Sequence, residues 1–180
     1  TAEGVVFTLR LPRIIGAVLV GSALSLSGAA YQGVFKNPLV APDLLGVSSG
    51  ACVGASVAIL LHLNSFGVQA MAFVAGILAV GLTLFIPRLI KNTNMTMLVL
   101  SGIIVKGIMD SVMGIIKYVA DPETELQSIT YWQLGSLTKV LPKDLFTVGP
   151  VIVAASVIIF LLRWRINILS LGDREAKTLG

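Results

Sequence analysis

Long, uninterrupted apolar runs dominate the pattern of hydrophobic and polar positions along this chain. Charged residues are absent from Ile14 to Phe35 and from Leu145 to Leu162. Between Asp43 and Arg88 only His62 could carry a charge. Each run is near, or a multiple of, the ~20 residues that a helix needs to cross a bilayer core at about 1.5 Å per residue. A transmembrane barrel would instead alternate in polarity over segments of about 10 residues. The pattern therefore predicts an all-α, polytopic transmembrane helical bundle.

The apolar runs divide into five predicted spans, and prolines mark two of the boundaries. Pro38 and Pro42 follow the first span and Pro87 closes the third, because proline lacks the N–H that a helix interior requires. The spans are expected at about residues 14–34, 46–63, 68–86, 97–118 and 145–162. The stretch 120–144 is expected to be the longest loop. We expect one bundle over residues 1–180, without a second domain or an internal repeat.

Basic residues are divided unevenly between the two faces that five spans define. Seven basic residues follow the first, third and fifth spans: Lys36, Arg88, Lys91, Arg163, Arg165, Arg174 and Lys177. Four basic residues lie on the other face: Arg10, Arg13, Lys139 and Lys143. The positive-inside rule then places the C-terminal segment in the cytoplasm and the N-terminal end outside. The opening residues TAEG lack a basic region and a starting methionine, so we expect a fragment that lacks its true start.

Composition agrees with a membrane protein and disfavours two other classes. The chain is 56% hydrophobic and 12% charged, with a mean hydropathy of +0.93, whereas a soluble domain is about 25% charged. The net charge of +4 does not indicate nucleic-acid binding, because the basic residues lie at span ends and not in one stripe with aromatics. His62 has no second ligand at metal-binding spacing, so no metal site is expected. The single cysteine, Cys52, is expected to be a small packing residue.

Small residues recur on one face of each of the first two spans, where they would let neighbouring helix backbones approach closely. The residues expected to pack helices are Ala17, Gly21, Ser25 and Gly28 in the first span, and Gly46, Gly50, Gly54 and Ala58 in the second. Packing is favoured over a ligand-binding role for these positions.

The fourth span carries charges. Lys106, Asp110 and Lys117 fall within about 40° of one helix face. A charge at the bilayer centre costs roughly 2.5 to 3.5 kcal/mol on insertion scales, so lipid-facing positions are disfavoured. Lys106 and Asp110 are four apart and could form an ion pair. The face either lines a water-filled pathway, or it holds a satisfied ion pair between helices with Lys106 extending toward the membrane edge.

The final segment, residues 168–180, differs from the apolar runs before it. Leu169, Gly172, Ala176 and Leu179 share one helix face, and Ser170 with Asp173 fits a capping box. We expect a short amphipathic helix at the membrane surface, which either rests on lipid head groups or docks into another protein, unless it is the first turn of a further element.

Sequence motifs of zinc peptidases and of nucleotide-binding proteins are absent. The chain contains no HExxH and no P-loop. We therefore expect no enzymatic activity and no cofactor. Energy for any transport would come from an ion gradient or from a separate subunit.

Three separated stretches resemble one family. They are RLPRIIGAVLVGSALSLSGAAYQGVFKNPLVAPDLLGVSSGA at residues 10–51, YWQLGSL at 131–137 and NILSLGDREAKTLG at 167–180. They are similar to the permeases of ABC importers for iron-siderophore, haem and cobalamin complexes. The resemblance implies ten helices per subunit, of which this chain would supply helices two to six, so it is a partial permease domain. Its orientation agrees with the one inferred from charge.

The resemblance implies partners and roles for particular residues. The permease would work as a homodimer in the bacterial inner membrane, with a cytoplasmic ATPase that binds the ATP and an extracytoplasmic substrate-binding protein. Arg10 and Arg13 would receive the binding protein. Lys106 and Asp110 become candidates for the translocation path, although neither matches a family motif. The residues expected to couple to the ATPase are Leu169, Ser170, Leu171, Gly172, Asp173, Ala176, Leu179 and Gly180.

The expected function is ATP-driven import of an iron-siderophore or related metal chelate. Two alternatives remain: an ion-coupled secondary transporter that uses Lys106 and Asp110, and a bundle that anchors a partner without transport. The three motif matches favour the ABC importer over both.

Overall fold

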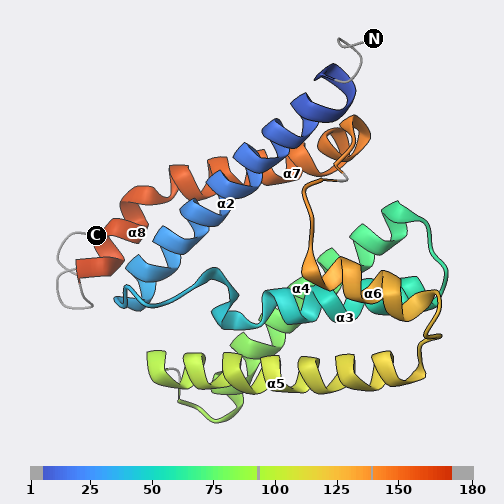
Figure 1. Cartoon of the computed structure of the whole chain (residues 1–180). Coiled ribbons are helices and arrows are strands. Elements are labelled where there is room, and N and C mark those ends of the chain that lie inside the picture. The colour runs from blue at the N-terminus through green and yellow to red at the C-terminus, as the bar shows by residue number, and fades with distance from the viewer. Residues whose placement is uncertain (1–5, 93, 139, 172–180) are drawn as a thin grey trace. The chain divides into compact units, whose positions relative to one another are not determined.

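The computed structural model describes residues 6–92, 94–138 and 140–171, and within these ranges every regular element is helical (Figure 1). The elements are η1 (Val6–Arg10), α2 (Leu11–Phe35), η2 (Pro42–Leu45), α3 (Val47–Leu60), α4 (Ser65–Leu89), α5 (Met95–Val119), α6 (Glu125–Leu134), α7 (Pro142–Leu161) and α8 (Arg163–Leu171). The predicted all-α fold class is confirmed.

Within the described ranges, four helical segments are long and apolar enough to cross a membrane: Val6–Phe35, Ser65–Leu89, Met95–Val119 and Pro142–Leu161. Each overlaps one of the predicted spans. The remaining predicted span, residues 46–63, corresponds to α3, which is apolar but has only 14 residues. At about 1.5 Å per residue such a helix covers roughly 21 Å, less than the ~30 Å of a bilayer core.

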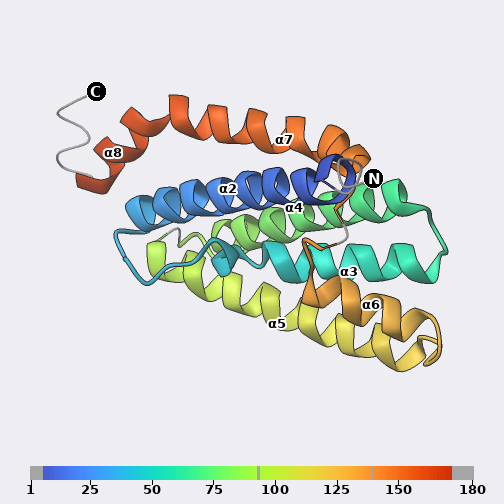
Figure 2. The ribbon, with the colours of Figure 1, turned by 45° about the horizontal axis from the view of Figure 1, so that its top comes forward.

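The chain divides into two compact units, each described by itself. Residues 1–42 and 136–180 form unit 1, and residues 43–135 form unit 2. In unit 1, α2 lies along α7 and α8 (Figure 2). Glycines mark the close approaches: a Cβ built on Gly16 would lie 3.5 Å from Val140 Cγ1, and one on Gly33 would lie 3.5 Å from Ile166 Cγ2.

In unit 2, α3 packs closely against α4. A Cβ built on Gly50 would lie 2.5 Å from the Cβ of Ala79, and one on Gly54 would lie 2.5 Å from the Cβ of Ala75. Real Cβ atoms do not approach so closely, so only glycine fits at these two positions. The two backbones therefore meet through small residues, as helices in membranes commonly do.

Helix α6 corrects the expectation of a long loop over residues 120–144. It packs on α3 and α5 through Ile129, which is 1% exposed and clusters with Met113, Ile116 and Ala120. It ends at Gly135, whose φ of 70° lies in the left-handed region that favours glycine. This helix has 10 residues, and isolated helices shorter than about 12 residues are marginal, so tertiary packing stabilises it.

Helix α8 corrects the capping box expected at Ser170. Ser170 lies inside the helix, and its hydroxyl donates a 2.6 Å hydrogen bond to the Asn167 carbonyl. Helix α8 begins earlier, at Arg163, immediately after the turn at Leu162 that follows α7.

Candidate translocation site

Lys106 lies halfway along α5, and its ionic partner is Asp43. The Lys106 Nζ lies 2.9 Å from Asp43 Oδ2, across 63 positions of sequence. Asp110, the partner that sequence spacing suggested, forms no ion pair with Lys106 in the described part of the chain. Asp43 belongs to the connector between α2 and α3, which we define as residues 36–46, so the ion pair joins the connector to the middle of α5.

The connector is also fixed by contacts with neutral groups. The Thr83 hydroxyl on α4 donates a 3.0 Å hydrogen bond to the Leu45 carbonyl, and Thr83 is completely buried. On α5, Gly102 lies so close to the Leu44 carbonyl that a Cβ there would overlap it. Gly46 adopts a left-handed φ of 74° beside the Lys106 backbone, so here the glycine is required by conformation.

The Asp43 carboxylate has a second donor. Its Oδ1 accepts a 3.2 Å hydrogen bond from the Ser48 N–H in the first turn of α3. Partial burial raises the pKa of Asp43, but the hydrogen bonds from Lys106 and Ser48, together with the Lys106 charge, outweigh burial and leave the pKa below its ordinary value. Asp43 is therefore ionised at neutral pH.

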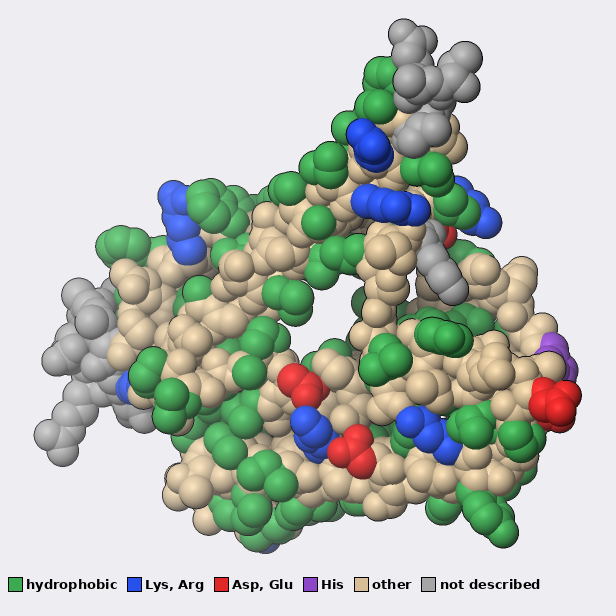
Figure 3. All heavy atoms as spheres, viewed as in Figure 1, with side chains coloured by type: hydrophobic (Ala, Val, Ile, Leu, Met, Phe, Trp, Pro, Cys, Tyr) green, Lys and Arg blue, Asp and Glu red, His purple; other side chains and the backbone are tan. Residues whose placement is uncertain are grey.

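A polar cavity of about 510 Å³ lies among α3, α5 and α6 in unit 2. Charged side chains gather along this part of the surface (Figure 3). The polar residues that line the cavity are Ser48, Ser49, Cys52, Lys106, Asp110, Lys117 and Gln133. Charges within an apolar helix point to a functional pathway when they face a cavity. The structure thus brings Lys106 and Asp110 together in one hollow.

Two residues of this cavity were not assigned a role from sequence. Lys117 donates a short hydrogen bond to the Gln133 side-chain oxygen, so it joins α5 to α6. Lys117 could have been included because it shares a helix face with Lys106 and Asp110. Neither Gln133 nor Asp43 gave such a signal, because their positions depend on long-range packing.

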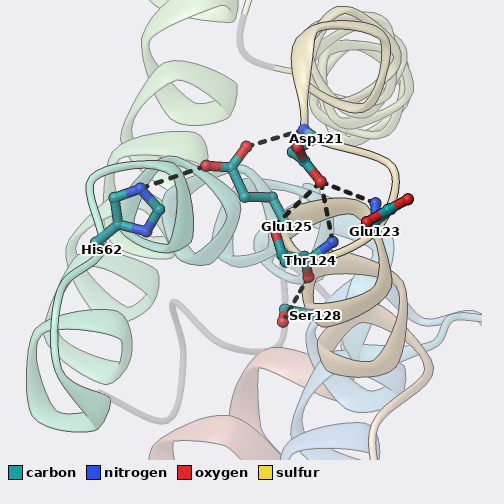
Figure 4. Close-up of polar contacts among 6 residues, drawn as sticks. All are labelled: His62, Asp121, Glu123, Thr124, Glu125 and Ser128. Atoms are coloured by element: carbon teal, nitrogen blue, oxygen red, sulfur yellow. Dashed lines mark hydrogen bonds and ion pairs between the residues drawn. The ribbon is translucent and has the colours of Figure 1, made fainter.

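At the same end of α5 as Lys117, a hydrogen-bonded network fixes the start of α6 (Figure 4). Glu125 Oε2 accepts a 3.0 Å bond from the Asp121 N–H, and Glu125 Oε1 lies 3.5 Å from His62 Nε2. Asp121 Oδ1 accepts bonds from the Glu123 N–H at 2.8 Å and the Thr124 N–H at 3.1 Å. His62 is therefore a contact of α6, and no group of residues able to hold a metal occurs in the described ranges.

The other predicted site residues fall in several places. Arg10 ends η1, and Arg13 lies in the first turn of α2, where its Nε is buried without a hydrogen-bond partner among the described residues. Leu169, Ser170 and Leu171 form the end of α8. Gly172, Asp173, Ala176, Leu179 and Gly180 lie outside the described residues.

The predicted packing residues also differ in their surroundings. Gly50, Gly54 and Ala58 are buried on α3. On α2, Gly28 is buried against Pro42, whereas Ala17, Gly21 and Ser25 are exposed. The face of α2 that meets α7 and α8 carries Gly16 and Gly33.

An all-α bundle with several bilayer-length apolar helices and a charged cavity defines a multi-pass membrane protein. Residues 1–180 match the FecCD transport family, and the chain belongs to that family. The resemblance to permeases of ABC importers for iron chelates, haem and cobalamin is thereby confirmed.

Relatives and a solved structure support this membership. The chain is 37% identical over 179 residues to a molybdate import system permease protein, MolB, from Haemophilus influenzae, covering 99% of this chain and 53% of the relative. It is 40% identical over 176 residues to a probable iron chelatin transport system permease protein from Helicobacter pylori, covering 98% of this chain and 53% of the relative. A solved structure described as an inward-facing conformation of a metal-chelate type ABC transporter superposes with a TM-score of 0.92 at 35% identity, covering 99% of this chain and 56% of that one. The chain thus spans about half the length of the curated relatives it matches.

Proposed function

We propose that this chain is the membrane-spanning part of a permease subunit that imports an iron-siderophore or related metal chelate into the cytoplasm. The observation that carries the proposal is membership of the FecCD transport family over residues 1–180. Relatives named for iron chelatin, hemin and cobalamin transport support the cargo class. Their common feature is a bulky metal complex, whereas the relative named for molybdate takes a small oxyanion.

The proposed assembly supplies what this chain lacks. A cytoplasmic ABC ATPase would bind and hydrolyse ATP, so the permease needs no cofactor of its own. An extracytoplasmic substrate-binding protein would deliver cargo, and a second permease subunit would complete the path across the bacterial inner membrane. Membrane lipid would surround the exposed apolar side chains.

We assign roles within that assembly to three parts of the chain. The segment from Leu169 to Gly180 would contact the ATPase and transmit its closure to the helices. Arg10 and Arg13 would contact acidic groups of the binding protein. Lys106 and Asp110 would line the path, which is supported by their place in the cavity of unit 2.

Reconstitution of the full-length permease tests this function. The permease, its ATPase and its binding protein are placed in proteoliposomes, and uptake of ferric siderophore, hemin, cyanocobalamin and molybdate is measured. Uptake is expected to require ATP hydrolysis and to persist when an uncoupler collapses the proton gradient. Uptake that stops with the uncoupler and needs no ATPase would instead indicate the ion-coupled alternative, which no relative favours.

A further inference from the structure

We propose that the cavity among α3, α5 and α6 selects negatively charged, oxygen-rich cargo, and that Lys117 is the residue that contacts it. The inference rests on the transport function proposed above and adds the charge class of the cargo. It is argued from the groups that line the cavity and from the hydrogen bonds that they already make.

The lining of the cavity carries a surplus positive charge. Lys106 and Lys117 contribute two ammonium groups, and Asp110 contributes one carboxylate, which leaves a net charge of one positive. Asp43 bonds to Lys106 but does not line the cavity. With Asp43 included the four ionised groups sum to zero, so the positive charge that a molecule in the cavity meets is local to the lysine ammonium groups.

The two lysine ammonium groups of this lining have hydrogen-bond donors that the described residues do not use. A lysine ammonium has three N–H donors and no acceptor. Lys106 uses one donor on Asp43 and Lys117 uses one on Gln133, and neither has another hydrogen bond within the described part of the chain. Charge-assisted bonds from such ammonium groups favour carboxylate, phenolate or oxyanion acceptors. Neutral apolar cargo would leave these donors unsatisfied, at a cost in free energy.

Lys117, unlike Lys106, has no carboxylate bonded to its ammonium group among the described residues. Lys106 has Asp43 at 2.9 Å and Asp110 one helical turn away. Lys117 donates its hydrogen bond to the neutral amide of Gln133. Lys117 also lies in the last turn of α5. Anionic cargo in the cavity would thus meet at Lys117 an ammonium group that no carboxylate of the described residues holds.

Cys52 is a free thiol that lines the same cavity, so its reactivity can report the electrostatic potential of the cavity. In the full-length permease, with any cysteine outside residues 1–180 changed to serine, Cys52 is modified with anionic and with cationic methanethiosulfonate reagents in lipid nanodiscs. We expect the ratio of anionic to cationic rates to exceed that of a free thiol in solution. Lys117→Gln should lower this ratio by about threefold or more, because one charge near the thiol is lost, whereas Lys117→Arg should preserve it.

Lys91→Gln is the matched control, since it removes the same charge from an exposed position just before the opposite end of α5. Citrate serves as the anionic probe: it should slow modification of Cys52 by an uncharged reagent in the wild type and do so less in Lys117→Gln. An unchanged ratio in Lys117→Gln, indifference to citrate, or a Cys52 that no reagent reaches would each overturn the proposal. A permease that passes these tests but shows no ATP-dependent uptake would count against the proposed function alone.

Discussion

Asp43 and Lys106 lie 63 positions apart, and their side chains meet at 2.9 Å. Both groups keep partial access to solvent, with 36% and 48% of their side chains exposed. Exposed pairs contribute about 0.2 to 1 kcal/mol, so the pair alone stabilises the connector modestly. Its larger effect is on position, because it keeps the Lys106 ammonium at the cavity beside Asp110.

Neutralising Asp43 should destabilise the detergent-solubilised permease by about 1 kcal/mol or less. The Asp43→Asn variant, the Lys106→Gln variant and the double variant form a cycle whose coupling energy isolates the ion pair. Thermal unfolding provides the measurement, with Lys91→Gln as a control for loss of charge. A coupling energy of zero would contradict the pairing.

The same pair predicts a dependence on pH. Because the folded-state pKa of Asp43 lies below its ordinary value of 3.8, the contribution is complete above pH 3.8 and is lost as pH falls through the lowered folded pKa. The stability difference between wild type and Asp43→Asn should therefore be constant near neutral pH and should close in acid. A stability difference between wild type and Asp43→Asn that grows as the pH falls would contradict this prediction.

At the scale of elements, glycine spacing controls how α3 meets α4. The four-residue interval between Gly50 and Gly54 places both on one helix face, where the α4 backbone and its alanines fill the space that side chains would occupy. Similar glycines elsewhere face no neighbour at all: nothing lies within 4 Å of a Cβ built on Gly81, Gly107 or Gly114. Glycines that look alike in the sequence therefore differ in the structure, because only some of them face a neighbouring helix.

Replacing Gly54 with alanine should separate α3 from α4 and destabilise the protein by about 1 to 3 kcal/mol, as overpacking commonly does. Gly81→Ala is the matched control in unit 2, and it should be neutral or slightly stabilising because alanine favours helix. The melting temperature of each variant, measured by size-exclusion chromatography of heated samples, should distinguish Gly54→Ala from Gly81→Ala. Equal tolerance of both substitutions would show that the helices do not approach as described.

Helix α6 depends on the contacts of Glu125. The Glu125→Ala variant removes the acceptor for the Asp121 N–H and the partner of His62, so hydrogen exchange across residues 121–130 should accelerate by several-fold. Glu123→Ala is the control, because Glu123 enters the network through its backbone N–H alone. Unchanged exchange in Glu125→Ala would mean that Ile129 packing suffices to hold α6.

At the scale of the whole molecule, the chain combines two compact units with only about half the length of its relatives. The connections between the units fall at Pro42–Asp43 and Gly135–Ser136. Residues that would communicate with partners lie toward the ends of the chain, in unit 1, whereas the charged cavity lies in unit 2. The proposed function would therefore rely on residues of both units.

Bulky substitutions in the coupling segment should uncouple ATP hydrolysis from transport. We expect Gly172→Leu with Ala176→Leu to reduce cargo uptake by the complete transporter at least about tenfold, equivalent to about 1.4 kcal/mol, while the ATPase subunit still hydrolyses ATP. Ala154→Leu, at an exposed position on α7, is the control. Uptake and phosphate release are measured in the same proteoliposomes. Unimpaired uptake would show that the segment does not couple to the ATPase.

The sequence by itself determined that this protein is helical, that it belongs in a membrane, and which family it resembles. Those conclusions depend on local properties, namely the length of apolar runs, the positions of basic residues and three motifs. It also placed Gly50 and Gly54 on one face of a helix, because the 3.6-residue period is a local property.

Only the tertiary structure decided the partner of Lys106, the packed face of α2 and the existence of α6. Each depends on contacts between distant segments: Asp43 reaches α5 because Thr83 and Gly102 hold the connector there, and α6 forms because Ile129 finds a buried site. No local pattern specifies such contacts, since the same lysine, glycine or short helix is compatible with several neighbours until the chain packs.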